Sequence, residues 1–114
     1  MSIFVLAAIV LLVSCKDTDV HNDYAKIFKY DGSIQCESDG ISREGMLFEL
    51  TQAGIDVLCS QKGNDGLGRI AMCGADTGNI NIFTINSASY QDAEKIGFQL
   101  TSELPKYKDK DCDI

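Results

Sequence analysis

An uncharged apolar segment opens the chain and limits how much of it is left to fold. Residues 3–13 are consecutive apolar residues, and no charged side chain precedes residue 16. A helix rises about 1.5 Å per residue, so this run would cover only about half of a ~30 Å hydrocarbon core. That length is typical of the apolar region of a signal peptide rather than of a membrane-spanning anchor. The sequence therefore predicts export, with residues 1–14 as the signal peptide.

The end of the apolar segment resembles the lipobox of bacterial lipoproteins. Its residues are a Leu, a branched residue, a small residue and a cysteine, namely Leu12, Val13, Ser14 and Cys15. The resemblance implies that the Cys15 thiol is diacylglycerated and that the chain is cut before Cys15. It also implies that the new amine is often acylated. Two or three acyl chains hold a protein stably on a bilayer, whereas a single chain binds only marginally.

The residues around the lipobox add two expectations. Met1 and Ser2 include no Lys or Arg, although signal peptides normally begin with a positive charge. Either the natural start lies further upstream, or the N-terminal amine supplies the only charge. The alternative is an ordinary cleaved signal peptide with a coincidental cysteine. In enteric lipoproteins an Asp after the lipidated cysteine retains the protein at the inner membrane, so Lys16 favours the outer membrane.

Four cysteines remain after Cys15, and an even number in a small exported chain predicts two disulfides. They are Cys36, Cys59, Cys73 and Cys112. Three connectivities are possible, and the spacing alone does not choose among them. The chain has no Cys-x-x-Cys pair and only one histidine, His21, which argues against a zinc site or a thioredoxin-like redox site. We therefore expect neither a metal nor a cofactor.

Local signals predict two helices. Ser42 is a typical helix N-cap, and Gly54 follows the last apolar residue of a helical pattern. A helix is therefore expected over residues 43–53, with Phe48 on its exposed face. A second, shorter helix is expected after Ser89, which can serve as its N-cap.

Short apolar or alternating segments predict the strands. The expected strands cover residues 27–30, 55–61, 69–73, 79–85 and 98–100. A glycine-rich turn over residues 63–68 would join the second and third of these as a hairpin, which would place Cys59 opposite Cys73. The unit strand, helix, glycine, strand thus occurs twice, once through Gly54 and once through Gly97.

This order of elements resembles a small ferredoxin-like or split-βαβ sandwich, an α+β fold with both helices on one face of an antiparallel sheet. The small SPOR domains of the bacterial envelope share the order, but the chain has no peptidoglycan-binding motif of that family. In the ferredoxin-like order the first and third core strands are neighbours, which favours a Cys36–Cys73 bond. Cys59 would then lie on an edge strand that Cys112 can reach. The pairing of Cys59 with Cys73 and of Cys36 with Cys112 stays open.

The chain divides into four expected parts. They are the signal peptide (1–14), a polar tether after the lipidated Cys15 (15–26), the α+β domain (27–100) and a polar tail pinned by Cys112 (101–114). The segments YDGSIQC (30–36), KGNDGL (62–67) and CGADTGNIN (73–81) are similar to a group of small uncharacterised proteobacterial envelope proteins. The similarity covers most of residues 27–98 and implies no activity.

Charge and residue types favour binding over catalysis. A net charge of −7 argues against nucleic acid as a partner, because a phosphate backbone needs a basic surface. Nucleophilic catalysis needs a base beside the nucleophile, and the sole His21 stands in the expected tether. Paired carboxylates occur in predicted loops and in the tail, where solvent exposure is expected. We therefore predict that the protein is not an enzyme.

The sequence indicates a lipid-anchored periplasmic domain that binds a partner, with its surface near residues 63–69 and 74–78. Lys62 and Arg69 flank the glycine-rich turn and are the candidates for an anion or partner site. The expected partners are the membrane, through the lipid, and another envelope protein. An immunity or inhibitor protein against an exported enzyme is the alternative, since acidity would suit a basic target. An unrecognised enzyme would need a concave pocket with convergent polar groups.

Overall fold

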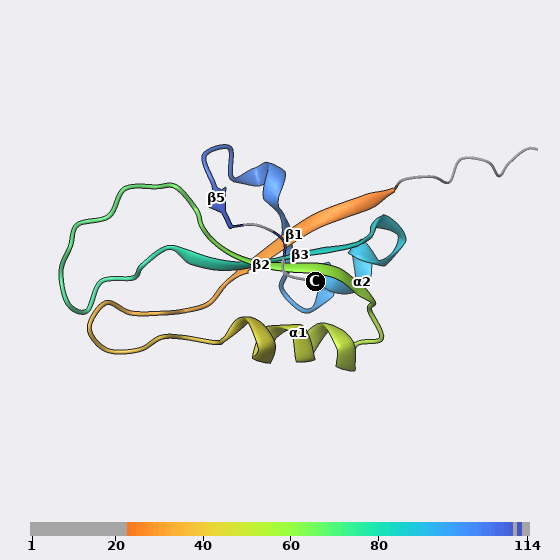
Figure 1. Ribbon diagram of the computed structural model, residues 1–114, viewed down its shortest axis with the longest axis horizontal. Coiled ribbons are helices and arrows are strands. Elements are labelled where there is room, and N and C mark those ends of the chain that lie inside the picture. Colours follow the sequence, from red (N-terminus) through yellow and green to blue (C-terminus); the bar gives the residue numbers. More distant parts are fainter. Residues whose placement is uncertain (1–22, 111, 113–114) are drawn as a thin grey trace, which may run out of the picture.

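One antiparallel sheet of five strands forms the centre of the protein, with the strand order β4-β1-β3-β2-β5 (Figure 1). The computed structural model describes residues 23–110 and residue 112, so the expected signal peptide (1–14), Cys15 and His21 lie outside the described residues. The strands are β1 (Tyr24–Tyr30), β2 (Val57–Asn64), β3 (Asn79–Asn86), β4 (Gln99–Leu100) and β5 (Lys108–Asp109). None of the described helices is long and apolar enough to cross a bilayer.

Two helices connect the strands and pack on the same face of the sheet. Helix α1 (Arg43–Gln52) joins β1 to β2, and α2 (Tyr90–Lys95) joins β3 to β4 after the 3₁₀ turn η2 (Ser87–Ser89). Side chains from both helices share one core with alternate residues of β1 and β3. The buried members of this core are Ala25, Ile27, Met46, Leu50, Ile55, Phe83, Ile85, Ala93 and Phe98. The predicted α+β class, with an antiparallel sheet and two helices, is confirmed.

Local signals account for the position of α1. The Ser42 hydroxyl accepts a hydrogen bond from the Gly45 amide at 2.9 Å, which satisfies one of the free N–H groups at the helix start. Gly54 follows the end of the helix with a φ of +80°, a conformation that residues with a Cβ seldom adopt. Phe48 is 61% exposed on the outer face, as expected. The helix prediction is therefore confirmed to within one residue.

The second short helix begins differently from the prediction. Ser89 makes no side-chain capping bond; instead, the Asn86 side chain accepts a hydrogen bond from the Ala88 amide at 2.9 Å. The turn η2 starts immediately after β3, so the residue that must satisfy free N–H groups lies three positions earlier than predicted.

The C-terminal segment covers the second face of the sheet. Phe28, Ile80 and Ile82 are buried there, and Leu104 and Tyr107 pack against them. The segment turns through η3 (Thr101–Glu103) and then pairs with β2 as β5. The prediction of a polar tail over residues 101–114 is therefore wrong for part of this segment. The segment packs apolar side chains against the sheet and forms a strand, because the sheet has two apolar faces and the helices cover only one.

The predicted hairpin between residues 55–61 and 69–73 is wrong. Strand β2 pairs directly with β3, and residues 65–78 form a long loop. Strand β3 is buried on both faces, through Ile80 and Ile82 on one and Phe83 and Ile85 on the other, so burial favours a central position for it between two partners.

The N-terminal boundary of the domain also differs from the prediction. Strand β1 begins at Tyr24, which pairs with Asn86, so the sheet starts before the expected residue 27. Ala25 is buried in the helix-side core, and the Lys26 ammonium bonds Asp109 at 2.7 Å. Residues 24–26, the last part of the expected tether (15–26), thus belong to the folded domain.

The four described cysteines form two disulfides, Cys36–Cys73 and Cys59–Cys112, with Cα–Cα distances of 5.0 and 5.7 Å. This is the pairing that the ferredoxin-like order favoured. The first bond does not join the neighbouring strands β1 and β3 themselves. It joins the loops that follow β1 and precede β3. The second bond fixes the C-terminal segment to β2.

Candidate functional site

Two long loops leave the same end of the sheet and lie side by side (Figure 1). The first loop (residues 31–42) follows β1, and the second loop (residues 65–78) joins β2 to β3. Because Tyr30 pairs with Ile80 and Asn64 pairs with Asn79, both loops start at the end of the sheet opposite Tyr24. We call this the loop end of the sheet.

A disulfide and a set of hydrogen bonds link the two loops. Cys36 of the first loop bonds Cys73 of the second. The Gln35 side chain donates to the Ile70 carbonyl and accepts from the Met72 amide, both at 3.0 Å. The Gln35 backbone forms two more hydrogen bonds to the second loop. The second loop therefore has a defined backbone, even though it contains no strand or helix.

A buried ion pair fixes the base of the second loop. The Asp65 side chain is fully buried, and both of its oxygens accept hydrogen bonds from the Arg69 guanidinium at 2.9 Å. The Tyr30 hydroxyl and the Leu67 amide donate to the same carboxylate at 2.8 and 3.0 Å. Burial alone would raise the pKa of Asp65, but these hydrogen bonds together hold it below its usual value. Asp76 contacts the other side of Arg69 at 3.1 Å.

Gly78 allows this ion pair to pack against the backbone. Its φ is +77°, and a Cβ at this position would lie 2.7 Å from the guanidinium carbon of Arg69 and 2.8 Å from an oxygen of Asp65. Any larger residue would push the two charged groups aside. A glycine is thus required here both by backbone conformation and by the close approach of the ion pair.

The structure does not support Lys62 and Arg69 as one anion site. Arg69 is bound by two carboxylates of its own loop. The Lys62 ammonium bonds the Asn81 side chain at 2.7 Å and the buried Asp31 carboxylate at 3.3 Å. Nearness in sequence predicted a shared site, but each cation contacts a different acidic partner. Arg69 is a structural residue of the second loop.

Exposed apolar side chains are concentrated on the second loop. Leu67, Ile70 and Met72 are 52, 68 and 56% exposed. Isolated exposed apolar residues are common, but three within six residues of a cross-linked loop form a more specific feature. In the sequence Ile70 and Met72 fell in the predicted strand over residues 69–73, and Leu67 fell in the turn before it. The binding surface predicted from the sequence, near residues 63–69 and 74–78, includes or borders this segment, but no sequence pattern marked these three side chains as exposed.

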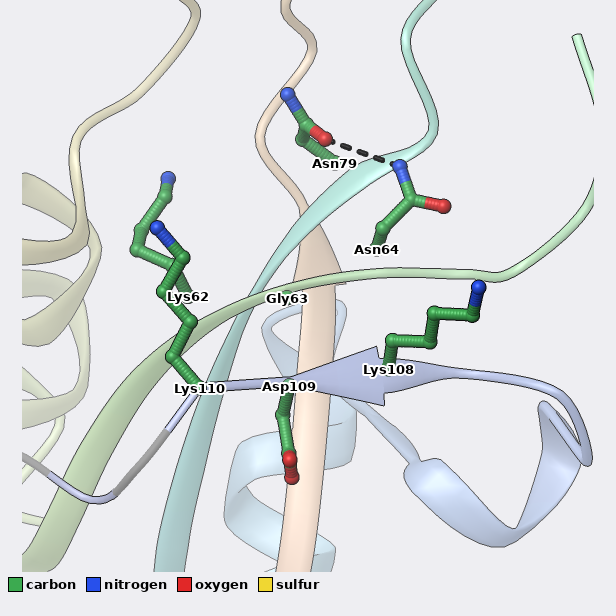
Figure 2. A pocket seen from close by; sticks show the side chains of 7 residues that line it. All are labelled: Lys62, Gly63, Asn64, Asn79, Lys108, Asp109 and Lys110. Carbon is green, nitrogen blue, oxygen red and sulfur yellow. Dashed lines mark hydrogen bonds between the residues drawn. The ribbon is translucent and has the colours of Figure 1, made fainter.

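A cavity of about 330 Å³ lies beside β5 at the loop end (Figure 2). It is lined by Lys62, Gly63, Asn64, Asn79, Lys108, Asp109 and Lys110. We call it the lysine cavity. Two of its lysines, Lys108 and Lys110, were missed in the sequence, where they stand in a run of mixed charges. Only the pairing of β5 with β2 brings them beside Lys62.

Every buried side-chain nitrogen or oxygen of the described residues has a hydrogen-bond partner. The described residues contain no group of three metal-ligating side chains. The chain matches no protein-family model, no curated protein and no solved structure.

Proposed function

We propose that the protein is a lipid-anchored periplasmic binding domain whose second loop is the contact surface for another envelope protein. The observation that carries this proposal is the exposure of Leu67, Ile70 and Met72 on a loop that a disulfide and an ion pair hold in place. Exposed apolar groups gain free energy when a partner covers them. A loop that is already ordered loses little conformational entropy on binding, which leaves more of that gain as affinity.

The position at which the chain enters the sheet supports a contact surface that faces away from the membrane. Strand β1 starts at Tyr24, at the end of the sheet opposite the two loops (Figure 1). A lipid on Cys15 would attach the domain to the membrane through the residues that lead into Tyr24. The loop end would then face away from that membrane, toward partners in the periplasm.

Ile70→Asp is expected to abolish partner binding without unfolding the protein. The side chain is exposed, so a charge there removes apolar contact area only in a complex. Tagged, membrane-attached protein would be crosslinked in cells and purified, and the bound proteins quantified by mass spectrometry. We expect recovery of the partner to fall at least about tenfold, the effect of losing about 1.4 kcal/mol of binding free energy.

Phe48→Asp is the matched control for this experiment. Phe48 is an equally exposed apolar residue, but it lies on the outer face of α1. Recovery of the partner should stay at the level of the unmodified protein. Equal recovery with both variants, or equal loss with both, would contradict the assignment of the contact surface to the second loop.

The lipid anchor gives a separate prediction. Cells grown with labelled palmitate should label the unmodified protein, and Cys15→Ser should remove all of the label, because the thiol is the expected attachment site. Cys59→Ser is the control, since Cys59 bonds Cys112 in the folded domain and should not affect lipid attachment. Label retained in Cys15→Ser would refute the anchor.

An inhibitor of an exported enzyme is the second candidate, and it would use the same loop. A projecting, cross-linked loop on a chain of net charge −7 would suit the active-site cleft of a basic enzyme. If the recovered partner is an enzyme, adding the purified domain should inhibit it in a one-to-one ratio, whereas Ile70→Asp should not. If the enzyme remains active when it is saturated with the protein, the result would support binding without inhibition.

A further inference from the structure

We propose that the lysine cavity binds a phosphate monoester or free phosphate. The inference rests on the cross-strand arrangement of its lysines, and not on the apolar loop. Its failure would therefore leave the proposed contact surface untouched, and the reverse also holds.

The register of β5 against β2 places like charges directly opposite one another. Lys108 pairs with Asn64, and the Lys110 amide donates to the Lys62 carbonyl at 3.0 Å, which sets Lys110 across from Lys62. Figure 2 shows the Lys62 and Lys110 side chains running in the same direction, whereas the Lys108 side chain extends away from them toward the other side of the view. Like charges opposite each other on antiparallel strands repel. An anion bound between the two ammonium groups would attract both of them and offset this repulsion.

Two of these cations have no acidic partner within the part of the chain that the structure describes. Asp109 is the only carboxylate that lines the cavity, and it bonds Lys26 at 2.7 Å. Figure 2 shows Asp109 pointing away from the lysine side chains. Lys62 is held by Asn81 and Asp31, which leaves Lys108 and Lys110 to meet a ligand.

The two asparagines of the cavity supply a fixed amide donor. The Asn64 side chain accepts from the Gly66 amide at 2.8 Å and donates to the Thr77 carbonyl and to Asn79 Oδ1, at 3.1 and 3.0 Å. These bonds orient the Asn79 amide, whose Nδ2 makes no hydrogen bond within residues 23–110. Both of its N–H groups are thus available to an anion.

The residue types favour phosphate over carboxylate. A phosphate monoester carries up to two negative charges and three acceptor oxygens, so it can be bound by several separate donors such as lysine ammoniums and an amide, whereas a carboxylate carries a single charge. The cavity volume lies within the range of small-ligand sites, which leaves room for a small group on the phosphate. Free phosphate and a lipid with a phosphate monoester headgroup share this chemistry.

The test is a titration of ¹⁵N-labelled protein with inorganic phosphate, followed by NMR at constant ionic strength with chloride as the balancing anion. We expect saturable shifts at the Gly63 amide and at the side-chain amides of Asn64 and Asn79. The double variant Lys108→Gln/Lys110→Gln should weaken binding at least about tenfold, because it removes both unpaired cations. The control Lys95→Gln removes an exposed charge from α2 and should leave the affinity unchanged.

A second arm identifies the source of the phosphate. If a lipid headgroup is the ligand, vesicles of phosphatidylcholine with phosphatidic acid should bind the Cys15→Ser protein, which lacks the expected lipid attachment site, and should not bind the double variant made in the same protein. Saturable binding of free phosphate without vesicle binding would assign the cavity to a soluble ligand. Shifts that rise linearly, or that persist unchanged in the double variant, together with no vesicle binding that depends on Lys108 and Lys110, would overturn the proposal.

Discussion

Arg69→Gln is expected to destabilise the protein and to lower its urea midpoint, because it removes the cation that pairs with the buried Asp65 carboxylate. The variant leaves the fully buried Asp65 carboxylate without its main cation, although the Tyr30 hydroxyl and the Leu67 amide remain. Urea unfolding followed by circular dichroism measures the change. Since domains of this size are stable by only about 5–15 kcal/mol, the effect should be large.

Two further variants show whether the loss comes from the pair. Lys95→Gln breaks an exposed contact with Asp92 at 4.0 Å and should change the free energy of unfolding by less than about 0.5 kcal/mol. Adding Asp65→Asn to Arg69→Gln should recover part of the loss, because the unpaired charge is then absent. An Arg69→Gln variant as stable as Lys95→Gln would show that Asp65 does not depend on this cation.

Replacing both Cys36 and Cys73 by Ser is the second large perturbation. The two residues are 37 positions apart, and the chain-entropy model assigns about 4 kcal/mol to closing a loop of that length. We expect a lower urea midpoint and, more specifically, faster amide exchange at Met72 and Gly74, whose N–H groups bond Gln35. These bonds hold the second loop against the first.

The other disulfide provides the control. Cys59 and Cys112 are 53 positions apart, so replacing both by Ser should cost a similar free energy, about 4 kcal/mol. It should not change amide exchange at Met72 and Gly74, because that bond fixes the C-terminal segment instead. If both pairs of replacements accelerate exchange in the second loop equally, the Cys36–Cys73 bond is not what orders it.

Local signals were enough to predict part of this fold. Ser42 and Gly54 mark the ends of α1, because capping depends on residues within one helical turn. The apolar run of β3 was also evident. The conformation of the second loop was not evident from the sequence, because Ile70 and Met72 alternate with smaller residues as they would in a strand. Their true conformation depends on Gln35, which lies far away in the sequence.

The residues of the candidate sites were harder to predict from the sequence than the helix ends were, because contacts between distant segments bring them together. Lys62 and Arg69 are close in sequence, yet each is bound by a different carboxylate that only the folded chain brings near. Lys108 and Lys110 reach the lysine cavity through the pairing of β5 with β2, which no local pattern in that charged segment indicates. Charge and spacing in the sequence therefore did not indicate which of these residues lie together in the folded protein.

If the second loop is a contact surface, as we propose, a partner must lie next to its exposed side chains in the cell. The most direct test places a photo-reactive amino acid at position 70 of the full-length protein in living cells, with position 48 as the reference. Both side chains are exposed, and only the first lies on the loop. We predict a discrete crosslinked complex from position 70 and none from position 48. No product from position 70, or the same product from both positions, would contradict the account.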